Sequence, residues 1–160
     1  MSDGDIKVLV DPYGTIEVNV ASGAAASIGP GEPVVRATNY GALITDGMPT
    51  VKTDYMIGIA NIESTDTVAA AGKVDVTLVG PGTRIRGKAK LSTTIDTAAE
   101  LLALMFDSCP FDVTTGVITI DLAAGTTITS YGLIVVGGDI NNYTADCVFN
   151  SGATLFGCDV

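Results

Sequence analysis

The sequence predicts an all-β fold with one short α-helix, arranged as a small β-barrel or β-sandwich that carries an N-terminal hairpin or arm. Short apolar segments alternate with polar residues at a period of two, which is typical of strands with one buried face. Clusters of Gly, Pro, Asp and Asn separate these segments. Only one stretch has helical spacing and a helix start signal. We expect residues 1–30 to form the hairpin or arm and a linker, and residues 31–160 to form the barrel domain, with its helix near residues 97–106.

The apolar stretch from Asp54 to Ala60 is the strand around which we expect the sheet to form. It is a short run bounded by turn residues, so a buried strand fits it better than a helix. Gly58 in its middle predicts a bulge or a close approach by another backbone. We therefore place this strand at the centre of the barrel or sandwich.

The first 20 residues predict a hairpin. Residues 6–10 and 15–20 both alternate, and the segment 11–14 between them, Asp-Pro-Tyr-Gly, has turn chemistry. Small residues follow from Ala21 to Gly31, which predicts a linker or a loop lying on a neighbouring molecule. Further strands are expected at 32–37, 42–44, 73–79, 83–91, 112–121 (a hairpin turning at Thr-Thr-Gly) and 128–136, followed by two or three short strands and a closing strand at 155–158.

The helix is expected to begin at Thr97. Thr97 and Glu100 have the spacing of a capping box, in which each side chain satisfies a free backbone N–H group. Pro110 lies beyond its end, where a proline cannot continue the hydrogen-bond ladder. Its apolar residues share one face and are expected to plug one end of the barrel: Ala98, Leu101, Leu104 and Met105.

Basic residues form the most unusual pattern in the chain. In the alternating segment 83–91, half of the eight basic residues fall on one face of the predicted strand: Arg84, Arg86, Lys88 and Lys90. Such a row needs acidic partners. Either Asp and Glu side chains of the same chain pair with it, or water solvates it, or it makes an electrostatic contact with another subunit. These four residues are the candidate protein-interface residues, and reversing Arg84 and Arg86 to Glu is expected to weaken assembly without unfolding the protein.

Overall composition restricts the classes of partner. Charged residues make up 16% of the chain, against about 25% in ordinary soluble domains. Either the domain buries its surface well, or other subunits cover part of that surface. The formal charge of −10 argues against binding to nucleic acid, which depends on basic residues. No apolar run approaches the roughly 18 residues of a membrane-spanning helix, so no membrane partner is expected.

The sequence predicts no catalytic, cofactor-binding or metal-binding residues. There is no histidine to activate a serine or cysteine nucleophile or to ligate zinc. The spacing from Gly82 to Lys88 matches that of a phosphate-binding loop, but Ala89 replaces the hydroxyl residue and no helix follows. The three cysteines, at 109, 147 and 158, are expected to be buried thiols, and a bridge between the last two is left open. Paired carboxylates for glycoside hydrolysis would usually be accompanied by aromatic platforms for the sugar, but the chain has no Trp and few other aromatic residues.

Three segments in the first half of the chain carry a resemblance. They are Gly31-Glu-Pro-Val34, Met56-Ile-Gly-Ile-Ala60 and Ala70-Ala-Gly-Lys-Val-Asp-Val76. Their order resembles a recurring pattern of tailed-phage capsid decoration (cement) proteins, in which a G-(D/E)-x-V strand precedes a G-(I/V)-A strand and an A-x-G-x-(V/I)-x-V segment. The resemblance covers residues 31–91, about 60 of the 160 residues, and includes neither the predicted helix nor the N-terminal hairpin.

The resemblance implies a structural virion protein on the outer surface of the capsid head. Proteins of this kind often form homotrimers where capsomers meet, and their partner is the major capsid protein. They need no active site and no cofactor. The alternative is a β-rich binding module of a tail, fibre or surface layer that recognises glycan or protein.

Overall fold

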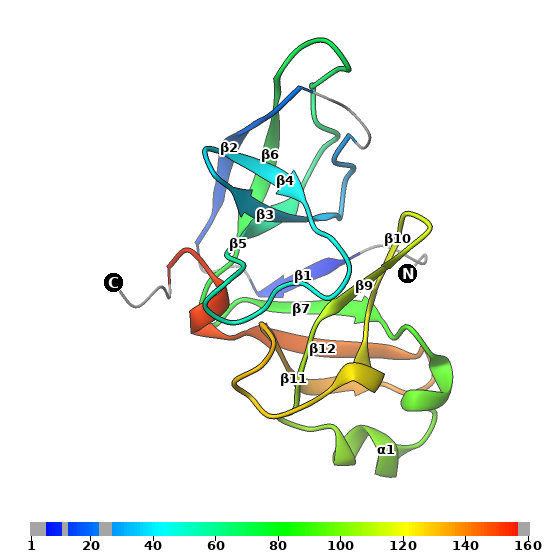
Figure 1. The fold of residues 1–160 in the computed structure, drawn as a ribbon. Coiled ribbons are helices and arrows are strands. Elements are labelled where there is room, and N and C mark those ends of the chain that lie inside the picture. The colour runs from blue at the N-terminus through cyan, green and yellow to red at the C-terminus, as the bar shows by residue number, and fades with distance from the viewer. Residues whose placement is uncertain (1–5, 11–12, 23–26, 157–160) are drawn as a thin grey trace.

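The computed structural model describes residues 6–10, 13–22 and 27–156. These residues form a closed five-stranded barrel, a five-stranded sheet and a two-stranded hairpin (Figure 1). The predicted all-β class with one short helix is confirmed. The strands are β1 (Lys7–Val10), β2 (Thr15–Val20), β3 (Pro33–Ala37), β4 (Tyr40–Leu43), β5 (Met56–Ala60), β6 (Gly72–Leu78), β7 (Arg84–Lys88), β8 (Ser108–Cys109), β9 (Phe111–Thr114), β10 (Val117–Ile120), β11 (Leu133–Asp139) and β12 (Thr144–Phe149). The helices are α1 (Ala98–Ala103) and the 3-10 turns η1 (Ser92–Thr94), η2 (Leu122–Ala124) and η3 (Ser151–Ala153).

The barrel has the strand order β2-β4-β3-β5-β6 and closes between β6 and β2. Strand β5 lies between β3 and β6, and all five of its residues are buried. A Cβ atom added to Gly58 would lie 2.2 Å from the carbonyl oxygen of Thr77 on β6. The register against β3 also shifts beside this glycine. The predicted buried strand and the close backbone approach at Gly58 are therefore confirmed, whereas a closed barrel has no central strand.

The other large sheet is antiparallel, with the order β1-β7-β12-β11-β8. The predicted hairpin of residues 6–20 is wrong: β1 pairs with β7, whereas β2 pairs with β6 and β4 of the barrel. The two strands bury their apolar side chains in different places, because Ile6 joins the core of the sheet and Val20 joins the core of the barrel. Residues 15–20, expected in an arm, thus supply a barrel strand. The division at residue 30 stays a prediction.

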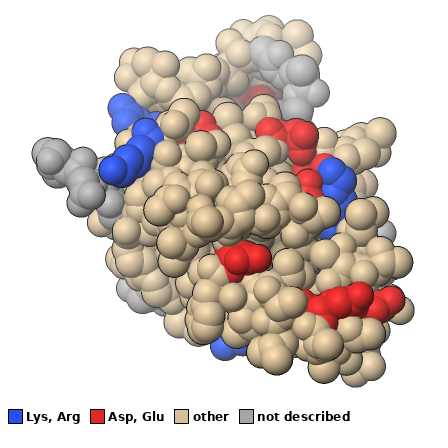
Figure 2. Space-filling view, turned by 60° about the horizontal axis from the view of Figure 1, so that its bottom comes forward, with Lys and Arg blue, Asp and Glu red and all other residues tan. Residues whose placement is uncertain are grey.

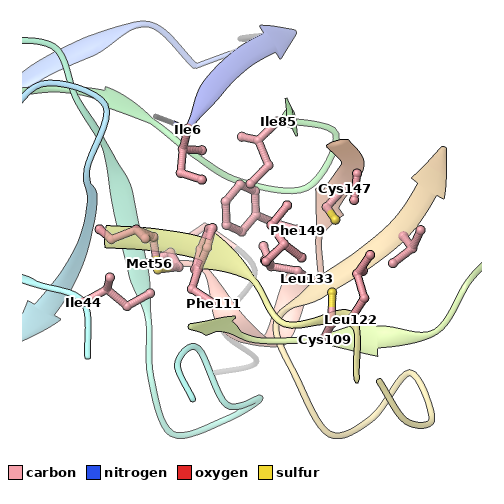
Figure 3. Close-up of a cluster of buried hydrophobic side chains, with 14 of the residues drawn as sticks. Ile6, Ile44, Met56, Ile85, Cys109, Phe111, Leu122, Leu133, Cys147 and Phe149 are labelled. Carbon is pink, nitrogen blue, oxygen red and sulfur yellow. The ribbon is translucent and has the colours of Figure 1, made fainter. Parts of the chain in front are cut away.

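Two clusters of buried apolar side chains stabilise the sheets and the barrel. The larger lies between the five-stranded sheet, the β9–β10 hairpin and the barrel, and Figure 3 shows Phe111, Leu133 and Phe149 at its centre. The smaller fills the barrel, where Ile28 is 1% exposed and its N–H donates to Ser64 Oγ at 2.9 Å. Within the described part of the segment 21–31, Ile28 is thus anchored in the barrel of this molecule, and contact of the segment with a neighbour stays a prediction. Sequence alone predicted the flexible composition but missed this anchoring isoleucine.

Helix α1 begins at the predicted capping box, but it does not lie at the end of the barrel where it was predicted. Thr97 and Glu100 form the capping box, but the helix has only six residues and none of them is buried. It lies beside β11, where Leu101 Cδ1 is 3.2 Å from the position of a Cβ added to Gly138. Figure 1 shows α1 at the end of the molecule remote from the barrel. The predicted barrel plug is wrong, because α1 connects β7 to β8 and both strands belong to the five-stranded sheet.

The C-terminal half follows the predicted strands with shifted bounds. The hairpin β9–β10 turns at Thr115 and Gly116, whose φ angles are 51° and 80°. Strand β11 spans 133–139 instead of 128–136, because its two glycines continue the pairing with β12 after a register shift. Leu155 and Phe156 form no strand, and the rest of the predicted strand 155–158 lies outside the described residues.

Candidate interaction surface

Strand β7 presents the predicted basic row on one face. Ile85 and Gly87 of β7 and Ala89 just after it are buried against the core, so the alternating basic side chains point away from it. The alternation predicted from the sequence is therefore confirmed. The four basic residues differ, however, in what they contact: Arg84, Arg86, Lys88 and Lys90.

Asp146 on β12 lies opposite the two arginines of β7. Arg86 donates from Nε and Nη2 to its two carboxylate oxygens, at 2.6 and 2.9 Å, and Arg84 donates from Nη2 to the second oxygen. The Asp146 side chain is 2% exposed, whereas the two arginine side chains are partly exposed. Burial raises the pKa of Asp146, but the hydrogen bonds from Arg86 and Arg84 outweigh burial and the pKa lies below its ordinary value. The carboxylate stays ionised and fixes both arginines.

Lys90 is likewise paired within the chain. Its Nζ atom lies 2.7 Å from an oxygen of Asp112 and 3.2 Å from one of Asp121. Hydrogen bonds to these two carboxylates raise the pKa of Lys90. Three of the four candidate residues thus have acidic partners in the same chain. Of the alternatives for this row, intrachain pairing accounts for Arg84, Arg86 and Lys90.

Lys88 is the member of the row without a carboxylate partner among the described residues. Its Nζ donates to the backbone oxygen of Asn142 at 2.9 Å. It faces Thr144 across the strand pair β7–β12. Beside it, the exposed Lys7 of β1 faces Arg86 across the strand pair β1–β7. Cations from two strands therefore meet on this polar face of the sheet.

A cleft of about 750 Å³ lies beside these cations. One wall is polar and comes from the sheet, with Arg86, Lys88 and Asp139. On the side of β1 and the barrel rim the lining is mixed, with apolar Val8 and Leu9 beside polar Lys7, Asn61 and Thr77. The cleft thus joins the edge strand β1 to the space between the sheet and the barrel.

Thr144 lines this cleft and is 1% exposed. Within the part of the chain that the structure describes, its hydroxyl oxygen has no hydrogen-bond partner. A buried polar group without a partner costs about 1–3 kcal/mol. Asp139, which faces Thr144 from β11, accepts hydrogen bonds from the Asn142 side chain and the Asn141 backbone, and these lower its pKa. The cleft therefore holds an ionised carboxylate, several cations and one unsatisfied hydroxyl.

Uncharged surface dominates the end of the molecule that carries α1. Figure 2 shows broad areas without Lys, Arg, Asp or Glu there, interrupted by a few acidic side chains. Leu102 is 72% exposed and Phe106 is 66% exposed. A groove of about 400 Å³ lies between α1 and Ile140. Twelve large apolar residues are exposed over the described chain: Val10, Ile16, Tyr40, Ile62, Val68, Leu91, Leu102, Phe106, Val117, Ile128, Tyr143 and Phe156.

The described residues offer few elements of catalytic or metal chemistry. No group of three or more Cys, Asp or Glu side chains among them is arranged to hold a metal ion. Cys109 and Cys147 are buried free thiols, as predicted, and the neighbouring Cys109 thiol and burial raise the pKa of Cys147. Cys158 lies outside the described residues, and Cys147 forms no bridge in this structure. The segment 82–88 forms a turn and strand β7 rather than a phosphate-binding loop. No helix of the described chain has the length and apolar character needed to cross a bilayer.

Comparison with known proteins does not assign this chain to a family. No protein-family model matches the chain, and no curated protein matches it. The surface must therefore be interpreted from its own chemistry. Sequence reasoning predicted that acidic groups face the basic row, but it missed Asp146, Lys7 and Thr144. The only sequence signal for them was their position in alternating segments, which does not reveal the partner strand.

Proposed function

We propose that this chain is a structural virion protein, a capsid decoration protein that binds the outer surface of the assembled head and stabilises it. The major capsid protein would be its partner, and a homotrimer its working form. The observation that carries the proposal is a surface poor in charge, with large apolar side chains exposed at several places on a closed β-fold. An apolar groove such as the one between α1 and Ile140 is typical of contacts with other proteins, whereas exposed apolar residues that stand alone are not. The pattern in residues 31–76 supports the same class.

The physical mechanism is stabilisation by mass action. A protein that binds only the assembled shell lowers the free energy of that state and leaves free capsid subunits unaffected. Several linked contacts in a trimer would raise the effective affinity without new chemistry. Such a role requires a stable, rigid fold and contact surfaces, and no reaction. We therefore propose a non-enzymatic function at the outer surface of the virion head.

A second candidate is a binding module of a tail, fibre or surface layer. One specific observation favours it: the cleft beside β1 combines cations, amides and a buried hydroxyl, as recognition sites for polar ligands do. A reproducible hit for one glycan class on a glycan array, lost on substitution of Lys88, would support this candidate over capsid attachment.

Oligomeric state is the first test of the capsid proposal. Light scattering of the purified protein is expected to give the mass of a trimer, and incubation with expanded heads is expected to give saturable binding. A variant with the exposed apolar residues Leu102 and Phe106 both changed to Ser probes the α1 surface, and Val68→Ser on the barrel is the matched control. Monomeric protein that does not bind assembled heads would contradict the proposal.

A further inference from the structure

We propose that the cleft beside β1 binds an extended, acidic segment of a partner protein, which adds to the sheet as a further strand. The proposal concerns the chemistry of the partner and stands independently of capsid attachment. It rests on the open edge of β1, the cations beside that edge, and the unsatisfied Thr144 hydroxyl.

Strand β1 is an edge strand whose outer side lines the cleft. Within the part of the chain that the structure describes, it pairs with β7 and with no other strand. Among the described residues, no backbone hydrogen bond joins Lys7–Val10 to any other strand, and the nearest one on the barrel side runs from the Ile6 N–H to the Gly31 carbonyl oxygen, at 3.3 Å. Exposed strand edges present free N–H and C=O groups that an extended peptide can pair with. The edge can therefore bind the main chain of an extended peptide, whatever the side chains of that peptide are.

Side chains around the edge specify an acidic ligand. Lys7, Arg86 and Lys88 line the cleft, although the whole chain has a formal charge of −10. Lys88 and Lys7 have no carboxylate partner among the described residues, whereas Arg86 is held by Asp146. A carboxylate of the ligand would supply the missing partner and accept a hydrogen bond from the buried Thr144 hydroxyl after a small displacement of the side chains above it.

The two walls favour a peptide over phosphate or nucleic acid. Asp139 is ionised in the polar wall, so it opposes the double charge of a phosphate dianion more than the single charge of a ligand carboxylate beside Lys88. On the β1 side, the partly exposed Val8 and Leu9 offer nothing to a small anion but can contact an apolar side chain. Because side chains of a strand alternate between its faces, one peptide can direct carboxylates to the polar wall and apolar groups to the other. An alternating acidic and apolar sequence matches both walls.

The test uses the full chain and a blocked hexapeptide in which glutamate and valine alternate. Titration followed by amide NMR shifts up to millimolar peptide is expected to perturb residues 7–9 and 88, and hydrogen exchange of the β1 amides is expected to slow. Lys7→Glu and Lys88→Glu should each weaken binding by about tenfold or more, because they oppose like charges. Thr144→Val should weaken it while keeping the fold. Lys52→Glu, the same change at an exposed lysine outside the cleft, should leave affinity within about twofold.

Several results would overturn the proposal. One is equal affinity for a peptide with lysine in place of glutamate. Another is unchanged binding in both charge-reversed variants, with folding verified by the same spectra. Shifts produced equally by inorganic phosphate, without slowed exchange at β1, would reassign the cleft to small anions. Head binding that persists while the peptide test fails would leave the capsid proposal standing and remove this one.

Discussion

Asp146 of β12 binds Arg84 and Arg86 of β7 at once, and its own side chain is 2% exposed. Because of this arrangement, substitutions at Arg84 and Arg86 do not test a subunit contact alone. Reversing Arg84 and Arg86 to Glu, the test suggested by the sequence, would place carboxylates against a buried carboxylate. It would therefore perturb folding as well as any subunit contact. Lys88 and Lys7 are the residues whose reversal can report on binding alone.

Removal of the Asp146 carboxylate is expected to destabilise the fold. Asp146→Ala leaves two neighbouring guanidinium groups without their shared partner, and hydrogen bonds to charged groups contribute about 1.5–3 kcal/mol. We expect a loss of about 2–3 kcal/mol in the free energy of unfolding, measured by urea titration. The control is Glu17→Ala, which removes the exposed pair with Lys73 and should cost less than about 1 kcal/mol. Equal losses in the two variants would show that Asp146 contributes no more than a surface pair.

Stability is expected to fall with acid through the same carboxylate. The pKa of Asp146 is lower in the folded chain than its unfolded value of about 3.9. Its contribution is therefore complete above about pH 4 and is lost as the pH falls through the folded pKa below that value. Asp112, whose pKa is also lowered, by Lys90 and Thr114 against the effect of burial, adds to the same window.

Urea midpoints measured from about pH 6 down to pH 2.5 test this expectation. The midpoint of the unaltered protein should drop most steeply below about pH 4, and the drop should be shallower in Asp146→Asn. If Asp146→Asn loses stability as steeply as the unaltered protein when the pH falls, protonation of Asp146 is not the cause of the acid destabilisation.

Gly58 is expected to tolerate no side chain. A Cβ atom there would meet the backbone of β6, since the Thr77 carbonyl oxygen lies 2.2 Å away. Gly58→Ala should therefore cost about 3 kcal/mol or more, or prevent folding. In Gly29→Ala the new atom would lie 3.5 Å from Glu32 Oε2, an ordinary contact, and stability should change by less than about 1 kcal/mol. Thermal unfolding followed by circular dichroism compares the two, and similar melting temperatures would contradict the barrel packing around β5.

Two buried threonines provide a test of the unsatisfied hydroxyl. Thr144 has no partner for its hydroxyl among the described residues, whereas Thr83 Oγ1 accepts a hydrogen bond from the Gly80 N–H at 3.0 Å. Thr144→Val should leave the free energy of unfolding unchanged or raise it by up to about 1 kcal/mol, and Thr83→Val should lower it by about 1–2 kcal/mol. Chemical denaturation measures both. A marked loss of stability in Thr144→Val would mean that its hydroxyl is satisfied in solution.

Local features of the fold were predictable from the sequence. The buried β5 strand, the capping box of α1, the β9–β10 hairpin and the alternation of β7 all follow from spacing within a few residues. Each depends on interactions between neighbours in the chain, which the sequence displays directly. The basic row was predictable for the same reason.

Long-range relationships were not predictable in the same way. A period of two shows that residues 6–10 and 15–20 are strands, but it does not show that they join different sheets. The position of α1 beside β11 depends on the connection between β7 and β8, which the helix sequence does not record. The acidic partner of the two arginines could not be predicted either, because Asp146 lies 60 positions beyond Arg86 in the chain. Pairing across such separations is decided by the whole fold.

Binding to assembled shells is the most direct test of the central claim. The purified chain is mixed with expanded, undecorated heads and, separately, with unassembled capsid protein, and each mixture is sedimented. We expect saturable co-sedimentation with heads, a repeating stoichiometry set by the capsid lattice, no binding to free subunits, and greater resistance of decorated heads to heat. A monomer that stays in the supernatant and leaves the heat resistance of the heads unchanged would contradict the account.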